Sequence, residues 1–155
     1  NNLENRFEII NKNIKDLESV FDKNSFDFII TNPPYKKMDT GKTNENSKKL
    51  ISRHEITATL KDFIKISYIM LKDKGTLYMV HKPERLVDII YQLRRNKIEP
   101  KEIRFVHPYE KKEPNLILIK AVKNGGQFLK IDKPLYVYNE RGEYTEEILK
   151  IYNKM

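Results

Sequence analysis

Strand-length and helix-length segments alternate along this chain, and this alternation constrains its fold more than any other feature. Residues 6–10, 26–31 and 76–80 are apolar over the length of a strand. Apolar residues recur at helical spacing in three other segments, residues 14–21, 54–71 and 83–93. This order predicts an α/β layer structure with a mostly parallel sheet, whose ligands gather at the carboxyl ends of the strands.

The pattern changes after Pro100. Residues 102–107 and 116–122 are apolar segments that lie too close in sequence for a crossover helix, so we expect them to pair as an antiparallel hairpin. A short extended segment follows at residues 134–138, and Thr145 is the expected N-cap of a final helix. The second half of the chain therefore adds an antiparallel hairpin to the sheet.

Composition limits the possible functions. The length of 155 residues fits a single domain, residues 1–155. A formal net charge of +8 attracts phosphates and favours a nucleic-acid partner, although a basic balance that serves only solubility explains it about as well. The absence of cysteine and the wide spacing of the three histidines predict no metal site. No segment reaches the ~18 apolar residues of a membrane span, and no secretory signal is evident, so we expect no membrane contact and a cytoplasmic protein.

The tetrapeptide Asn32-Pro33-Pro34-Tyr35 directly follows the segment 26–31, and its side chains could take part in catalysis. Because Asn-Pro often begins a turn, a plain turn is one explanation. However, two prolines fix the backbone and leave carbonyls facing outward, and an aromatic ring follows. The Asn32 side-chain oxygen and the Pro33 carbonyl could each accept a hydrogen bond from an amino group on a ring, and Tyr35 could stack on that ring. This arrangement favours an aromatic amine, such as flipped-out adenine, as substrate.

Basic side chains are concentrated after the tetrapeptide, in a segment without helical or strand periodicity. This segment is expected to be a loop that is either simply solvated or clamps a substrate strand. His81, Lys82 and Arg85 follow the end of another strand, so they should face the same edge of the sheet as Asn32. The candidate RNA contacts are Lys36, Lys37, Arg53, His81, Lys82 and Arg85.

The tetrapeptide resembles the catalytic motif of class I S-adenosylmethionine-dependent methyltransferases that act on exocyclic or amide nitrogens. Further segments make the resemblance more specific, since they are similar to the Gram-positive branch of the bacterial valine-tRNA adenine-N(6) methyltransferases. These segments are Arg53-His-Glu-Ile56, Val80-His-Lys-Pro-Glu-Arg-Leu86, Val106-His-Pro108, Pro134-Leu-Tyr-Val-Tyr138 and Gly142-Glu-Tyr-Thr-Glu146. The resemblance implies a Rossmann-like methyltransferase fold, S-adenosylmethionine as cofactor, and methylation of the exocyclic amino group of the adenine next to the tRNA anticodon.

The resemblance also assigns roles to individual residues. Asn32, Pro33, Pro34 and Tyr35 correspond to the catalytic site for the target amine, and Asn32 also faces the cofactor. Asn13 stands where the family has an acidic residue that contacts the adenine of the cofactor, and an amide oxygen can still accept a bond from that amine. Cofactor contact is therefore expected from Asn13, Ile14 and Asn32.

The sequence departs from the family in its glycines. Their positions allow neither the glycine-rich cofactor turn nor a phosphate loop; they are Gly41, Gly75, Gly125, Gly126 and Gly142. The chain thus resembles the carboxyl-terminal part of a methyltransferase without its cofactor-loop half. We expect it to bind S-adenosylmethionine weakly or not at all when alone, and to be inactive alone. The missing strands would leave apolar faces open at Phe7, Ile9, Phe28 and Ile30, which predicts a homodimer or pairing with a missing N-terminal fragment.

Three other functions stay open. A protein-glutamine or a DNA-adenine methyltransferase would share the fold and the motif, and a non-catalytic RNA-binding module could keep the base pocket without a cofactor.

His54 and Glu55 could form an acid–base pair, but helix capping is the stronger interpretation. The tyrosines near the C-terminus are expected to serve packing more than base binding; they are Tyr136, Tyr138, Tyr144 and Tyr152.

Overall fold

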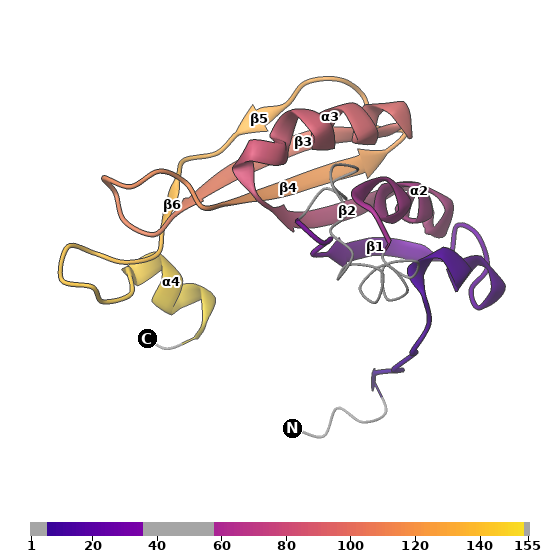
Figure 1. The fold of residues 1–155 in the computed structure, drawn as a ribbon, viewed down its shortest axis with the longest axis horizontal. Helices are drawn as coiled ribbons and strands as arrows, with labels where there is room; N and C mark the ends of the chain where they lie inside the picture. The colour runs from indigo at the N-terminus through magenta and orange to yellow at the C-terminus, as the bar shows by residue number, and fades with distance from the viewer. Residues whose placement is uncertain (1–5, 36–57, 154–155) are drawn as a thin grey trace, which may run out of the picture.

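The computed structural model describes residues 6–35 and 58–153 of the chain. Strands and helices alternate in its first half and a hairpin follows (Figure 1). The strands are β1 (Phe26–Thr31), β2 (Leu71–His81), β3 (Ile98–His107), β4 (Leu116–Lys123), β5 (Lys130–Ile131) and β6 (Leu135–Tyr136). The helices are η2 (Ile14–Ser19), α2 (Leu60–Met70), η4 (Pro83–Arg85), α3 (Leu86–Arg95) and α4 (Glu146–Ile151). The α/β fold predicted from the alternation is confirmed.

Within the described residues the strands form one mixed sheet in the order β1-β2-β4-β3-β5, with β6 also paired to β3. Strand β1 lies parallel to β2, whereas β4 lies antiparallel to both β2 and β3. The antiparallel hairpin is therefore confirmed. The sheet is mixed rather than mostly parallel, because β4 inserts between β2 and β3 and its two long pairings are both antiparallel.

The core lies on the face of the sheet that α2 and α3 cover. Ile64 of α2 and Leu93 of α3 are fully buried against strand residues such as Leu77 and Ile117. On the other face of β1, Phe28 and Ile30 are exposed in the described structure. The predicted exposure of this face is thus present, whereas the partner that would cover it stays a prediction.

Helix α2 is set by its caps. Thr59 and Asp62 form a capping box, so the helix begins at Leu60 rather than near His54, which lies outside the described residues. At its other end the chain passes directly from Met70 into β2, so that residues 72–75, which precede the predicted strand 76–80, also belong to this strand. The β1–β2 register shifts here, and Gly75 leaves no room for a side chain because a Cβ would lie 2.9 Å from the Lys72 carbonyl oxygen.

The expected strand at residues 6–10 is not formed. The segment has no strand hydrogen bonds, and Ile9 is 95% exposed. An apolar segment of strand length becomes a strand only where a neighbouring strand supplies hydrogen-bond partners, and none of the described strands lies beside it. Residues 14–19 do form a helix, but as a 3-10 helix shorter than the spacing predicted.

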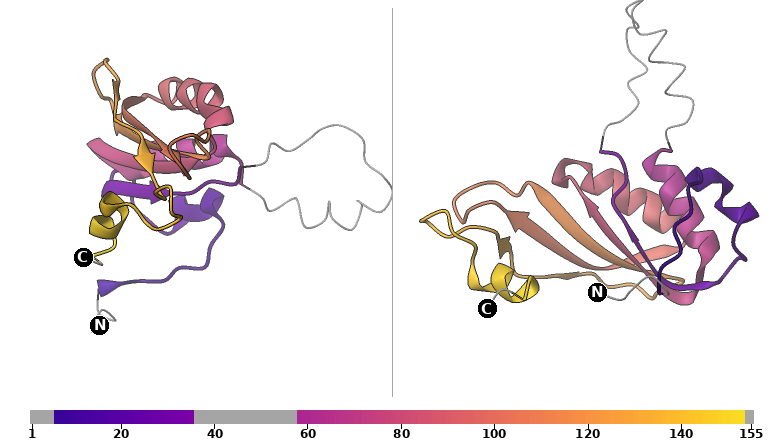
Figure 2. Two further views of the ribbon diagram at one scale, coloured as in Figure 1. Left: turned by 90° about the vertical axis from the view of Figure 1, so that its left-hand side faces the viewer. Right: turned by 90° about the horizontal axis from the view of Figure 1, so that it is seen from below.

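The C-terminal unit packs beyond one end of the sheet. Val106, Leu135 and Ile148 form a second small apolar cluster, and Thr145 caps α4 as predicted. Figure 2 shows α4 and η2 at opposite ends of an elongated molecule. Among the described residues, no helix is both long and apolar enough to cross a bilayer.

Candidate functional site

The tetrapeptide lies at the carboxyl end of β1, as predicted. Thr31 is the last strand residue and pairs with Met79 of β2, so Asn32 leaves the sheet at the edge where β2 also ends. Pro33 is buried, whereas Asn32 and Pro34 are exposed. The buried proline fixes the chain to the sheet while the amide of Asn32 stays accessible to a ligand.

Arg85 holds the end of the tetrapeptide in place. Its Nη1 donates a hydrogen bond of 3.1 Å to the backbone oxygen of Tyr35, and its Nε donates one of 2.8 Å to Asp88. The Arg85 side chain is only 15% exposed. Arg85 was predicted to contact RNA, but in this structure its guanidinium fixes the backbone of Tyr35 and pairs with Asp88.

His81 packs against the same tyrosine. Its ring meets the Tyr35 ring edge-on, with centroids 5.1 Å apart at 68°, and the residue is 0% exposed. The predicted contact between His81 and an RNA phosphate is therefore wrong for this structure, because the β2 pleat turns the ring inward. His81 instead forms the inner wall behind Tyr35.

Hydrogen bonding fixes the tautomer of the neutral His81 ring. The Lys82 backbone N–H donates to Nδ1 at 2.8 Å, so the neutral ring carries its proton on Nε2. Burial lowers the pKa of His81, which keeps the ring uncharged near neutral pH. Nε2 has no partner of normal hydrogen-bond geometry among the described residues, although the Pro34 backbone lies near enough to raise the pKa slightly.

Lys82 connects the tetrapeptide to the β3–β4 turn. Its Nζ lies 5.7 Å from the centroid of the Tyr35 ring and donates a hydrogen bond of 3.2 Å to the Asn115 carbonyl. A cation in this position adds positive potential beside the ring. The structure brings Lys82 and Arg85 to the edge of the sheet where Asn32 lies; Lys36, Lys37 and Arg53 lie outside the described residues.

Asn13 and Ile14 lie toward the same edge. Asn13 caps η2, where its side-chain oxygen accepts a hydrogen bond of 3.0 Å from Lys15 N. Lys15 also pairs at 3.7 Å with Asp62, in the first turn of α2. Because α2 ends where β2 begins, its first turn lies toward the carboxyl ends of the strands. Asn13 is thus a half-buried amide beside the apolar Ile14, on the side of the sheet where the strands have their carboxyl ends.

These residues fit one part of S-adenosylmethionine. An amide oxygen such as that of Asn13 is of the chemical type that accepts an adenine amino group, and Ile14 offers an apolar contact to a ring. The chain's five glycines supply no glycine-rich turn for the rest of the cofactor. The arrangement can therefore present an amine at Asn32 and contact the adenine of a methyl donor at Asn13.

One feature of this edge has no signal in the sequence. Tyr109, Tyr136 and Tyr138 line a cavity of about 320 Å³, although the C-terminal tyrosines were expected to serve packing. The rings do pack on one another, with Tyr138 stacked on Tyr144 at 13°. No sequence signal joins Tyr109 to this group, because the pairing of β3 with β6 brings the segments together.

Comparison with protein families gives one match to most of the chain. A sequence model of the family described as Eco57I restriction-modification methylase matches residues 1–113. No curated protein matches this chain.

Solved methyltransferases share the fold. The predicted O-methyltransferase Atu636 of Agrobacterium tumefaciens has a TM-score of 0.69 at 18% identity, over 90% of this chain and 56% of its own. TTHA0409 of Thermus thermophilus, a candidate DNA modification methylase solved with S-adenosyl-L-methionine, has a TM-score of 0.52 at 15% identity, over 89% of this chain and 58% of its own. The chain therefore spans somewhat more than half the length of these structures, and identities this low show the fold alone.

Proposed function

This chain belongs to the Eco57I restriction-modification methylase family. From that membership, and from the resemblance of residues 53–56, 80–86 and 134–138 to tRNA methyltransferases, we propose that the chain carries the target-amine site of an S-adenosylmethionine-dependent adenine-N(6) methyltransferase acting on tRNA next to the anticodon. The observation that carries the proposal is the geometry of residues 32–35. An exposed Asn32 follows a strand end, a buried Pro33 anchors it, and Arg85 holds the backbone of Tyr35. The proposed activity belongs to a whole protein, since the matched structures extend well beyond the part that this chain covers.

The proposed mechanism needs no strong base. The lone pair of an adenine amino group is delocalised into the ring, so the nitrogen is a weak nucleophile. Hydrogen bonds from its two N–H groups to the Asn32 side-chain oxygen and the Pro33 carbonyl rotate and pyramidalise it, which directs the lone pair at an electrophile. Tyr35, backed by His81, stacks on the base and holds it outside its own helix or loop.

S-adenosylmethionine would supply the electrophile, a methyl group on positively charged sulfur. Methyl transfer would form an N–C bond while the S–C bond breaks with its electron pair on sulfur, and the nitrogen would release one proton to water. Asn13 and Ile14 would contact the adenine of the donor. The uncharged His81 beside Tyr35 adds no further positive charge next to an amine that becomes cationic during transfer.

Nucleic acid is the substrate class that charge favours. The chain carries a formal net charge of +8, and Lys82 lies beside the Tyr35 ring. The similarity of residues 53–56, 80–86 and 134–138 to tRNA methyltransferases puts tRNA first. A flipped base is least costly to bind from a loop, because its bases are already unpaired.

Adenine in DNA is a second possible substrate. The family carries the description of a restriction-modification methylase, and TTHA0409 is a candidate DNA modification methylase. We would assay the full-length protein that contains this chain, with radiolabelled S-adenosylmethionine, against an unmodified tRNA transcript, duplex DNA and a release-factor protein. Methylation of the tRNA transcript supports the proposal, methylation of duplex DNA alone supports the second candidate, and methylation of protein alone contradicts both.

A further inference from the structure

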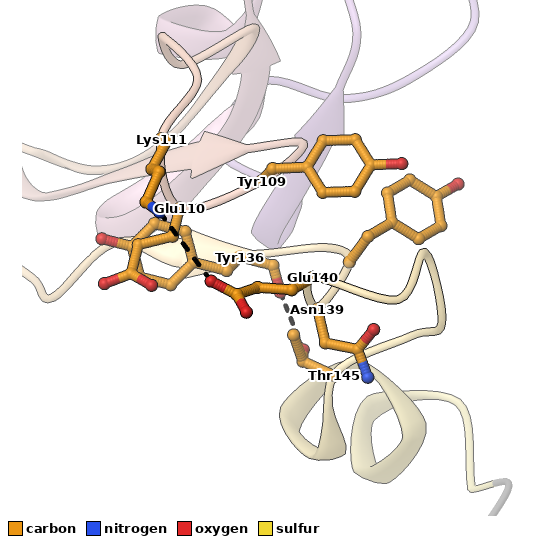
Figure 3. Close-up of a pocket in the computed structure, with 8 residues that line it drawn as sticks. Tyr109, Glu110, Lys111, Tyr136, Asn139, Glu140 and Thr145 are labelled. Carbon is orange, nitrogen blue, oxygen red and sulfur yellow. Dashed lines mark hydrogen bonds and ion pairs between the residues drawn. The ribbon is translucent and has the colours of Figure 1, made fainter.

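A cavity of about 320 Å³ lies between the β3–β4 turn and the segment that follows β6, away from the tetrapeptide. Tyr109, Tyr136 and Tyr138 are its aromatic lining residues, and Glu110 and Glu140 also line it. Figure 3 labels Tyr109, Tyr136 and the two glutamates. The volume falls at the lower end of the range typical of small-ligand sites, about 300–1,000 Å³. The cavity is therefore large enough for a single nucleobase with its sugar.

We name this cavity the tyrosine pocket. Its aromatic rings are supported by contacts with other tyrosine rings. Tyr138 stacks on Tyr144 with centroids 5.3 Å apart at 13°, and Tyr109 lies 5.4 Å from Tyr138 at 34°. The Tyr138 backbone is tied to the turn by a hydrogen bond of 2.9 Å from its N–H to the Pro108 oxygen. Tyr109 is 39% exposed, so this residue of the supported aromatic group stays accessible to a ligand.

The rim of the pocket adds polar groups. Glu140 and Lys111 form a long ion pair of 3.9 Å between two strongly exposed side chains, which costs little to open. Freed carboxylates accept hydrogen bonds from the amino and imino groups of a base, and a lysine can meet its phosphate. Stacking rings with carboxylate acceptors and a cation match a nucleotide better than they match a purely apolar ligand.

The pocket lies on the same edge of the sheet as the tetrapeptide. His81, at the carboxyl end of β2, pairs with Ile117 at the start of β4. His107, at the carboxyl end of β3, pairs with Tyr136 of β6. Lys82 contacts both the tetrapeptide and the β3–β4 turn, because its Nζ lies over the Tyr35 ring and donates a hydrogen bond to the Asn115 carbonyl.

We infer that the tyrosine pocket binds a second unpaired nucleobase of the RNA loop that presents the target adenine. The inference rests on the proposed function and sharpens its substrate class. Two separate sites for unpaired bases on one edge suit a single-stranded loop, whereas duplex DNA with one flipped base would fill only the first. The pocket therefore favours loop RNA over duplex DNA.

The test uses the full-length protein and an unmodified tRNA transcript. Tyr109→Ala should raise the KM for the transcript about 5- to 100-fold, the loss expected when one base loses its stacking partner, with little change in kcat. Tyr109→Phe keeps the ring and should recover most of the affinity. Tyr91→Ala is the matched control, because Tyr91 is 59% exposed on α3. An equal KM for the two alanine variants would overturn the inference, as would the same Tyr109 dependence on duplex DNA.

A second measurement does not depend on catalysis. Tyr109→Trp places a fluorophore in the pocket, and the transcript should quench it, whereas Tyr91→Trp should show no quenching; the chain itself has no tryptophan. Absence of quenching at position 109 would contradict the inference. If the wild-type protein methylates no nucleic acid, the proposed function fails, and quenching at position 109 would still support base binding in the pocket.

Discussion

The two sites at the carboxyl edge of the sheet are built in different ways. Residues 32–35 are fixed by polar bonds to the backbone and by burial: Arg85 donates to the Tyr35 oxygen, and His81 stands behind its ring with 0% exposure. The tyrosine pocket is built of rings that pack on one another and leave Tyr109 partly exposed. The backbone of residues 32–35 is therefore held in one conformation. The tyrosine pocket instead presents an aromatic surface on which a base could stack in more than one orientation.

This difference predicts a division between chemistry and affinity. A site that serves the transition state loses kcat when it is altered, whereas a stacking surface that binds substrate and transition state equally changes KM. Variants of the tetrapeptide and its supports should therefore lower kcat, in contrast to the Tyr109 variants.

The largest effect is expected at Asn32. Asn32→Ala removes one of the two proposed acceptors for the amine and should lower kcat about 10²- to 10³-fold, as loss of one transition-state hydrogen bond does elsewhere. Affinity for the tRNA transcript should stay nearly unchanged. Single-turnover methyl transfer and a binding titration measure the two quantities, and wild-type kcat would remove Asn32 from the mechanism.

A smaller loss is expected at Arg85. Arg85→Met keeps the length of the side chain but loses the bond to the Tyr35 oxygen, so kcat should fall about 10-fold, roughly the loss of one charged hydrogen bond. Arg95→Met is the matched control, because Arg95 lies in the last turn of α3, where its Nη1 donates a hydrogen bond of 3.4 Å to the Tyr91 hydroxyl. A raised KM with unchanged kcat would instead indicate that Arg85 contacts substrate phosphate.

His81 predicts how stability depends on pH. Burial lowers its pKa in the folded protein, helped by Arg85 and opposed by Glu84, so below about pH 6.5 the unfolded chain binds more protons and stability falls as pH falls. Above that pH the contribution is complete. Each pKa unit between the two states is worth about 1.4 kcal/mol.

Thermal melts between pH 5 and 8 check this expectation. His81→Phe should melt with a shallower fall in Tm on acidification than the wild type. His107→Phe is the control, since His107 is half-buried in the described structure and its Nδ1 lies 2.7 Å from the Lys112 carbonyl oxygen. Identical pH dependence of His81→Phe and the wild type would contradict the assignment of a buried, neutral His81.

The smallest effect is expected at Lys82, which joins the two sites. Lys82→Met loses a hydrogen bond of 3.2 Å and a cation–π contact worth about 0.5–1 kcal/mol at an exposed position. We expect a 2- to 5-fold fall in kcat/KM, about the equivalent of that energy. In a double-mutant cycle with Tyr109→Ala, non-additive losses would show that the sites are coupled, and strict additivity would show that they act separately.

The sequence was sufficient to predict that residues 32–35 lie at the end of β1, because the signals are local. An apolar strand followed by two prolines defines both the strand end and the exit of the chain, and the Thr145 cap and the hairpin are similarly local. Helix α2 began later than its apolar spacing indicated, because the capping box at Thr59 and Asp62 decides where a helix starts.

Features that depend on distant partners could not be predicted. The apolar residues 6–10 resemble a strand, yet no described strand pairs with them. The position of His81 at a strand end was evident, but the direction of its ring depends on the β2 pleat, which turns it toward the core. The tyrosine pocket needs the short pairing of β3 with β6, whose register no local pattern specifies.

The central claim is that Asn32 and Pro33 hold the exocyclic amine of an adenine. The most direct test is to identify the methylated atom, by nucleoside mass spectrometry of a tRNA transcript treated with the full-length protein and S-adenosylmethionine. We predict N(6)-methyladenosine in the anticodon loop. Methyl groups on a ring nitrogen, on a ribose oxygen or on protein alone would contradict the account.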